Sequence, residues 1–157
     1  EGPALETFRG LFGDERQDYG QALDAYYANG APQGWSQTHI SAYATAHPWE
    51  DFAETFAHAL HIIDTVEMAA AFGIGASTRT GDAGLDMAPA ELDPYREPDM
   101  VRIIDNWVPL ASLINNLNRA VGQADAYPFI LSPQVIEKLA FINTLVRQKP
   151  DAFSPAV

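Results

Sequence analysis

Residues His47 to His61 read HPWEDFAETFAHALH, and this run predicts the long central helix of the fold. In a helix, Glu50, Glu54, His58 and His61 stand at i, i+4, i+8 and i+11, so their side chains share one face. These four residues are called the Glu–His row below. A row of two carboxylates and two imidazoles suits either a metal site or a buried polar network. Both uses make this helix the first place to look for function.

Apolar side chains at three- and four-residue spacing predict further helices on both sides of this run. The first is expected from about Leu5 to Ala28, with a bend or break near Gly13, because a glycine weakens a helix by about 1 kcal/mol relative to alanine. Pro48 is placed to open the central helix, since its missing N–H costs nothing in the first turn. Later helices are expected to open at Pro98-Asp99 and at Ser132-Pro133.

No run of alternating residues is long enough to form a sheet, and no internal repeat is present. Residues 77–97 are expected to form one long irregular loop, because they contain several Gly, Pro and Asp and little periodicity. A length of 157 residues suits one domain with a sizeable core. The prediction is therefore a single all-α domain over residues 1–157, a compact bundle of four to five helices with one long irregular loop.

Composition narrows the classes of partner. Nine Lys plus Arg against 21 Asp plus Glu leave a net charge of −12, which repels nucleic acid and anionic membranes. No apolar run approaches the roughly 18 residues that a membrane-spanning helix needs. The absence of cysteine rules out disulfides, thiolate zinc sites and cysteine nucleophiles within these residues, and it fits a cytoplasmic protein.

Taken by itself, the Glu–His row allows several interpretations. Glu54 with His58, or His58 with His61, can clamp one zinc ion from a single helix face. Alternatively, Glu50 and Asp51 complement the positive end of the helix dipole, Glu54 is solvated, and the histidines fill surface or core positions. A di-iron bundle is disfavoured because no second Glu-x-x-His segment is present.

Two further polar groups have open interpretations. Glu15 can orient a histidine of the central helix, or it can pair with Arg9 or Arg16. Three asparagines within the helix after residue 98 are unusual, because asparagine competes for backbone hydrogen bonds. They either line a polar groove or face water, and they are Asn115, Asn116 and Asn118.

Four stretches of the sequence are specific enough to compare with known families: LFGDER at 11–16, SAYA at 41–44, HPWEDFAETFAH at 47–58 and KLAFI at 138–142. Together they resemble a bacterial family of zinc-dependent metallopeptidases, and the resemblance covers most of the chain. Members of that family are similar to gluzincin peptidases and often carry an N-terminal zinc ribbon. In such enzymes a His-Glu-x-x-His-like helix supplies two zinc ligands and the general base, and a downstream helix supplies a glutamate as the third ligand.

The resemblance implies roles for particular residues. The segment Glu50-Asp51-Phe52-Ala53-Glu54 has the form of the downstream motif, so Glu50 is expected to be the zinc ligand with Glu54 supporting it, and the reverse assignment is open. His58, His61 and Glu15 are then supporting or alternative ligands. The cofactor implied is zinc, in the complete protein, and the substrate class implied is a peptide or protein.

The chain also departs from the family pattern. The upstream histidine-bearing helix is not found in these 157 residues, the chain starts at Glu1 rather than Met, and Asn143 stands where a histidine is expected. We therefore expect the C-terminal part of a larger metallopeptidase that is inactive by itself, with the general base in the missing segment. The alternatives are a self-contained metal-binding helical module and a metal-free helical interaction domain.

Overall fold

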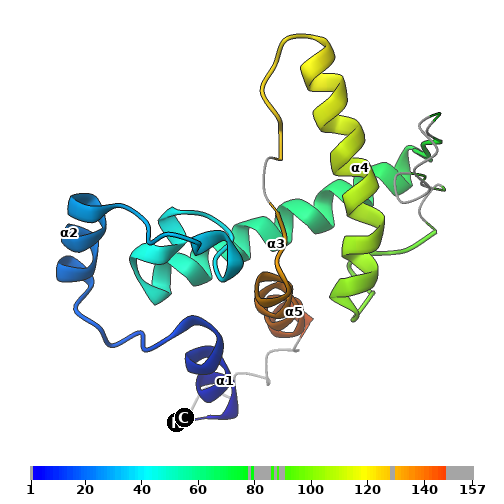
Figure 1. Ribbon diagram of the computed structural model, residues 1–157. Helices are drawn as coiled ribbons and strands as arrows, with labels where there is room; N and C mark the ends of the chain where they lie inside the picture. The colour runs from blue at the N-terminus through cyan, green and yellow to red at the C-terminus, as the bar shows by residue number, and fades with distance from the viewer. Residues whose placement is uncertain are drawn as a thin grey trace, which may run out of the picture.

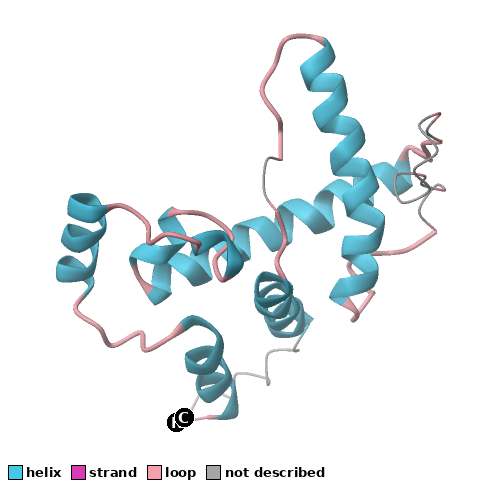
Figure 2. Ribbon diagram, viewed as in Figure 1, coloured by secondary structure: helices cyan, strands magenta, loops and turns pink. Residues whose placement is uncertain are grey.

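The computed structural model of the chain describes residues 2–77, 79, 86, 88, 91–127 and 130–147. Within these residues the fold consists of five α-helices and two short 3₁₀ helices, with no β-strand (Figures 1 and 2). The all-α prediction is therefore confirmed. Much of the predicted irregular loop at 77–97 lies outside the described residues. No helix in the described ranges is long and apolar enough to cross a bilayer.

The N-terminal part contains two helices instead of one continuous helix. Helix α1 spans Pro3–Phe12 and helix α2 spans Tyr19–Asn29. The chain breaks at Gly13, whose φ of 101° lies in the region that side-chain-bearing residues rarely adopt. Asp18 then caps α2 by accepting a hydrogen bond from the backbone N–H of Gln21 at 2.9 Å. The break falls where the sequence placed it.

Helix α3, spanning Pro48–Ala71, runs through the middle of the molecule (Figure 1). His47 caps its N-terminus, because the Nδ1 atom of His47 accepts a hydrogen bond from the backbone N–H of Trp49 at 3.1 Å. The helix packs against α1, α4 and α5 and against the short helix η2 (Tyr43–Ala46) that precedes it. The other short helix, η1 (Trp35–Gln37), packs against α5. Helix α2 (Tyr19–Asn29) packs mainly against η2.

Helix α4 spans Met100–Ala120 and crosses α3 (Figure 1). Asp99 caps it by accepting from the backbone N–H of Val101 at 2.9 Å, so the helix opens where predicted. Helix α5 spans Pro133–Arg147 and follows the cap residue Ser132. The Ser132 hydroxyl accepts from the backbone N–H of Val135 at 3.2 Å and donates to the carbonyl of Gln37 at 2.8 Å.

The core forms where α3, α4 and α5 meet, and α1 adds aromatic rings at one side. Phe8 and Phe12 of α1 stack at 5.0 Å and meet Phe52 of α3. Burial of such side chains supplies the main driving force for folding. Large side chains that are fully buried include Ile40, Ile62, Val66, Met100, Ile103, Val135, Leu139 and Ile142. The core therefore holds α3, and with it the Glu–His row, in one fixed rotational setting.

Candidate functional site

The Glu–His row lies along α3 and changes in exposure from one end to the other. Glu50 and Glu54 are half-buried, His58 is buried, and His61 is exposed. The rings of His58 and His61 stand at right angles with centroids 6.1 Å apart. The shared face that the spacing predicted is therefore present, with its carboxylates open to solvent and one imidazole enclosed.

Glu50 is held by a phenol from another part of the chain. The hydroxyl of Tyr19, at the first position of α2, donates a hydrogen bond to Glu50 Oε1. This hydrogen bond raises the pKa of Tyr19, because the phenolate would face a carboxylate. Tyr43 lies nearby, and desolvation, a hydrogen bond to Tyr27 and the Glu50 charge raise the pKa of Tyr43 to about 12. Neutral phenols therefore surround this carboxylate at neutral pH.

His58 is paired with a tyrosine that the sequence did not single out. Its Nδ1 makes a hydrogen bond with the Tyr127 hydroxyl, and the two rings stand at 83° with centroids 5.3 Å apart. Burial lowers the pKa of His58, against the opposing effect of the Glu54 charge, and burial raises the pKa of Tyr127. Both groups are therefore neutral at pH 7, with the phenol donating to the imidazole.

Glu15 is engaged away from the histidines of α3. Arg9 donates to both of its carboxylate oxygens, from Nε at 2.8 Å and from Nη2 at 2.5 Å. These hydrogen bonds lower the pKa of Glu15. Pairing with Arg9 was one of the two interpretations of Glu15, although it bridges the break at Gly13 and does not lie within one helix. Arg16, the other candidate partner, binds Asp14.

The donor groups near the row suit only part of a zinc site. A catalytic zinc takes three protein ligands and keeps one position open. Across the residues that the structure describes, no group of three or more His, Cys, Asp or Glu side chains is arranged to hold a metal ion. Glu50 and Glu54, one turn apart and half-open, have the carboxylate chemistry that zinc accepts. They fit one side of a ligand set and not the whole of it.

A buried ion pair next to the row was not predicted from the sequence. Asp51 is 1% exposed, and its Oδ2 accepts from Lys138 Nζ of α5 at 2.5 Å. Lys138 also donates to the carbonyl of Thr38 at 2.7 Å, and His39 Nε2 lies 3.7 Å from the same carboxylate. Lys138 and His39 also line a pocket of about 310 Å³ against α1.

Burial controls the charge states in this cluster. Desolvation raises the pKa of Asp51 to about 6, in spite of the opposing effect of Lys138. Desolvation, followed by the positive charge of Lys138, lowers the pKa of His39 to about 4. The sequence assigned Asp51 only to the helix dipole. Its spacing from Thr55 and Ala59 already placed it on the buried stripe of α3, and this was the available signal.

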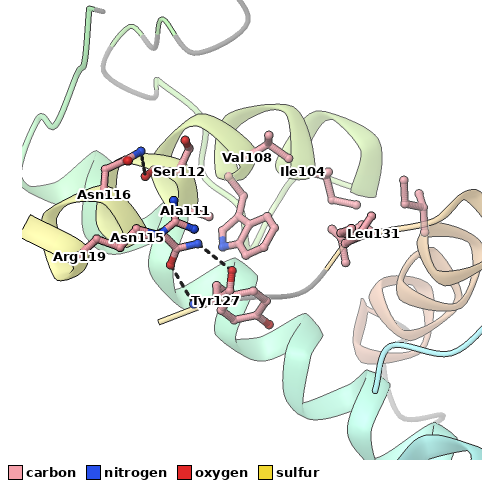
Figure 3. A pocket seen from close by; sticks show the side chains of 12 residues that line it. Ile104, Val108, Ala111, Ser112, Asn115, Asn116, Arg119, Tyr127 and Leu131 are labelled. Atoms are coloured by element: carbon pink, nitrogen blue, oxygen red, sulfur yellow. Dashed lines mark hydrogen bonds between the residues drawn. The ribbon is translucent and has the colours of Figure 1, made fainter. Parts of the chain in front are cut away.

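The asparagines of α4 organise the chain that follows that helix. Asn115 pairs with the backbone of Tyr127 in both directions, donating to its carbonyl at 2.8 Å and accepting from its N–H at 3.0 Å (Figure 3). Asn118 donates to the carbonyl of Ala124 at 3.1 Å. Asn115 and Asn116 also line a pocket of about 420 Å³ that has both apolar and polar walls, and Asn116 is exposed there.

Asn143 has a structural role at the position where a histidine was expected. It is fully buried on α5, and its amide donates to the carbonyls of Glu97 and Pro98 at 3.3 and 3.0 Å. Its oxygen accepts from Arg147 Nε at 2.9 Å. The side chain therefore fixes the chain just before α4 begins.

Comparison with known proteins gives a consistent result. Residues 1–145 match the model of a protein family described as "putative zinc-binding metallo-peptidase". Uncharacterised proteins of Mycobacterium bovis and of two Mycobacterium tuberculosis strains are each 43% identical to the chain over 152 residues. That alignment covers 97% of this chain but 42% of each relative, so the chain spans less than half of their length. No solved structure matches the chain.

Proposed function

The chain belongs to the family of putative zinc-binding metallo-peptidases, and from that membership we propose that it forms one wall of the active site of a zinc-dependent peptidase. Glu50 supplies a carboxylate ligand to the zinc ion, and Glu54 supports it. The family resemblance noted in the sequence is confirmed by the match over residues 1–145. The roles of the individual residues and the peptide or protein substrate are our proposal.

The observation that carries the proposal is the setting of Glu50. Its Oε1 accepts from the Tyr19 hydroxyl, and its Oε2 has no hydrogen-bond partner in the described part of the chain. A carboxylate held through one oxygen is oriented for a ligand at the other. Glu54 lies one helical turn away on the same half-open face. The hydrogen bond joins two helices, since Tyr19 lies on α2 and Glu50 on α3.

The residues of this chain orient the candidate ligand Glu50 and keep the neighbouring phenols neutral. Tyr19 fixes the orientation of Glu50, and the neutral hydroxyl of Tyr43 adds no competing negative charge. When bound, zinc supplies the Lewis-acid chemistry that polarises a peptide carbonyl. His58, locked by Tyr127, forms part of the wall next to Glu54.

The remaining ligands and the general base come, in this proposal, from parts of the longer protein. Support comes from the length comparison, because the chain aligns with 42% of each relative. Three ligands are needed for useful zinc affinity at a catalytic site. These 157 residues, as the C-terminal portion of such an enzyme, therefore do not cleave peptides by themselves.

We also place the complete protein in the cytoplasm, on the basis of its composition. The chain has no cysteine, as expected where disulfides do not form. Fractionation of cells with an antibody against the chain tests this assignment, and recovery in the membrane or extracellular fraction would contradict it.

Zinc content of the protein expressed from its complete reading frame is the decisive measurement. We expect one zinc per chain, lost in Glu50→Ala and retained in Glu67→Ala, which removes an exposed carboxylate from the same helix. Glu54→Ala is expected to weaken zinc binding without abolishing it. Full zinc retention in Glu50→Ala would overturn the assignment, and loss in Glu54→Ala alone would reverse the two roles.

A calorimetric zinc titration of the metal-stripped 157-residue chain separates the alternatives. We expect weak or absent binding, because the chain holds only part of the ligand set. Tight one-to-one binding that disappears in His58→Ala would instead establish a self-contained metal module. Zinc-dependent cleavage of a peptide library by this chain would equally contradict the proposal.

A further inference from the structure

We propose that the pocket beside α4 binds one apolar side chain of a peptide, while Ser112 and Asn116 hold the adjoining peptide backbone at its rim. This pocket is called the α4 pocket below. The inference rests on the proposed function, since it names the kind of peptide residue that the peptidase would accept. Its evidence comes from a different part of the molecule than Glu50.

The α4 pocket has the size and lining of a side-chain site. Its volume is about 420 Å³, and one face of α4 forms a wall (Figure 3). The buried side chains of Trp107 and Ala111 lie on that wall, and Leu131 and Ile136 lie opposite. Pockets of about 300–1,000 Å³ with an apolar lining and a few polar groups are typical ligand sites. Arg119 also lines the pocket, but its guanidinium binds the Asp125 carboxylate. A charged side chain would lose its hydration against the apolar part of the lining, so that part favours an apolar residue.

The pocket is held open by contacts that need no ligand. Asn115 fixes the backbone of Tyr127 through two hydrogen bonds, and the Tyr127 ring meets the Trp107 ring edge-on at 4.6 Å. The Tyr127 hydroxyl is bound to His58 of α3. A wall fixed in advance lowers the entropy lost on binding. The site is therefore built before any peptide arrives.

The rim offers hydrogen bonds of the kind that a peptide backbone needs. Asn116 uses its amide N–H to bind the carbonyl of Ser112 at 2.9 Å (Figure 3). Among the described residues, no partner is present for the Asn116 side-chain oxygen or for the Ser112 hydroxyl. The oxygen accepts from an N–H and the hydroxyl donates to a carbonyl, and a peptide bond supplies one of each. These groups distinguish a peptide from a purely apolar molecule.

Tyr127 connects the α4 pocket to the Glu–His row. The same residue lines the pocket and binds His58, so one side chain separates the two places. A peptide residue seated in the pocket therefore lies one side chain away from His58, on the helix that also carries Glu54 and Glu50. This continuity favours a peptide substrate as the occupant over an unrelated small molecule.

Small amides test the inference on the 157-residue chain without zinc. N-acetyl-L-phenylalaninamide and N-acetyl-L-leucinamide are titrated while the three Trp indole resonances are followed by NMR. We expect saturable shifts at Trp107 with a dissociation constant of about 1–10 mM, and binding of N-acetylglycinamide weaker by at least about tenfold. Absence of a shift, or shifts confined to Trp35 and Trp49, would overturn the site.

Matched variants locate the binding on the helix. Val108 lines the pocket and is 44% exposed, whereas Val101 is 49% exposed on the same helix and does not line it. Val108→Glu is expected to weaken binding of N-acetyl-L-phenylalaninamide by about tenfold or more, and Val101→Glu is expected to leave that binding unchanged. Ala111→Leu, which fills the pocket, should act like Val108→Glu. Equal effects of the two glutamate variants would contradict the site.

Rim variants test the peptide part of the inference. The double variant Ser112→Ala, Asn116→Ala is expected to weaken the amide probes by about three- to tenfold and to leave binding of toluene unchanged. Unchanged binding of the amides would show a purely apolar site and overturn the peptide assignment. Zinc is absent from these titrations, so a negative result would not contradict the proposed role of Glu50. Conversely, a zinc measurement that contradicts the role of Glu50 would not affect these titrations.

Discussion

Glu50 is partnered by a phenol and not by a cation, and this choice affects its chemistry. An arginine or lysine at the position of Tyr19 would neutralise the carboxylate and compete with a metal ion. A hydroxyl orients the group and preserves its negative charge. The contrast lies within the same molecule, because Arg9 engages both oxygens of Glu15. Of these two glutamates, Glu15 has both oxygens bound by a guanidinium, and Glu50 is bound through one oxygen by a neutral hydroxyl.

Glu50→Gln should lower the pKa of Tyr19, because the carboxylate that disfavours the phenolate is removed. Ultraviolet absorbance titration of the tyrosines, compared with a Tyr19→Phe background that assigns the signal, measures this shift. Glu67→Gln, an exposed change on the same helix, is the control and should leave the Tyr19 titration unaltered, because the Glu67 charge acts on the pKa of Tyr95 and not on that of Tyr19. An unchanged Tyr19 titration in Glu50→Gln would contradict the hydrogen bond.

Removing one member of the buried ion pair should cost far more than removing both. Lys138→Met is expected to lower the free energy of unfolding by about 3–5 kcal/mol at pH 7, because the Asp51 carboxylate stays buried without its partner. The double variant Asp51→Leu, Lys138→Met should lose substantially less. Urea unfolding at pH 7 measures both. Asp14→Asn, in an exposed pair with Arg16, is the control and should cost far less than Lys138→Met.

At the level of elements, helix starts and stops follow local chemistry. Asp99 and Ser132 cap α4 and α5 through hydrogen bonds to backbone N–H groups two or three residues onward. Pro48 and Pro133 occupy first-turn positions, where no N–H is needed. Gly13 ends α1 in a conformation that other residues avoid. These devices act within a few residues and are therefore readable in the sequence.

Two glycines of the N-terminal segment should respond to alanine in opposite directions. Gly13→Ala is expected to destabilise the chain by about 1–2 kcal/mol, because its φ of 101° strains a side-chain-bearing residue. Gly10→Ala is expected to stabilise it by about 0.5–1 kcal/mol, because Gly10 is helical and a Cβ there meets nothing within 4 Å. Thermal and urea unfolding check both, and equal effects would contradict the break between α1 and α2.

For the whole molecule, the cluster of Asp51, Lys138 and His39 joins α3, α5 and the loop before η2. The two groups with shifted pKa values, Asp51 and His39, change the free energy of unfolding in opposite directions as the pH falls. Asp51, with its pKa raised to about 6, binds its proton more tightly in the folded state, which favours folding on acidification. His39, with its pKa lowered to about 4, resists protonation in the folded state, which disfavours folding between pH 6.5 and 4. The net dependence in that range is therefore small.

Replacing His39 should remove its destabilising effect at acidic pH. The stability of His39→Gln relative to the unchanged chain is expected to rise by on the order of 1–3 kcal/mol as the pH falls from 6.5 to 4, because the opposing histidine is gone. Urea unfolding at a series of pH values measures the difference. A flat difference in His39→Gln would contradict the burial of this group.

Local pattern was sufficient for the all-α class, for the break at Gly13, for the openings of α3, α4 and α5, and for the shared face of the Glu–His row. Caps, proline positions and a 3.6-residue period depend on neighbours in the chain. The family resemblance belongs to the same category, because motif spacing is itself a property of the sequence.

The partners of those residues came from the folded structure. Lys138 reaches Asp51 across 87 residues, Tyr127 reaches His58 across 69, and Tyr19 reaches Glu50 across 31. No periodicity encodes which distant segment packs against a given helix face, because that depends on how all the helices share one core. The spacing along α3 therefore identified the candidate ligands, and only the packing of the other helices determined which charges are buried, which are held and which stay open.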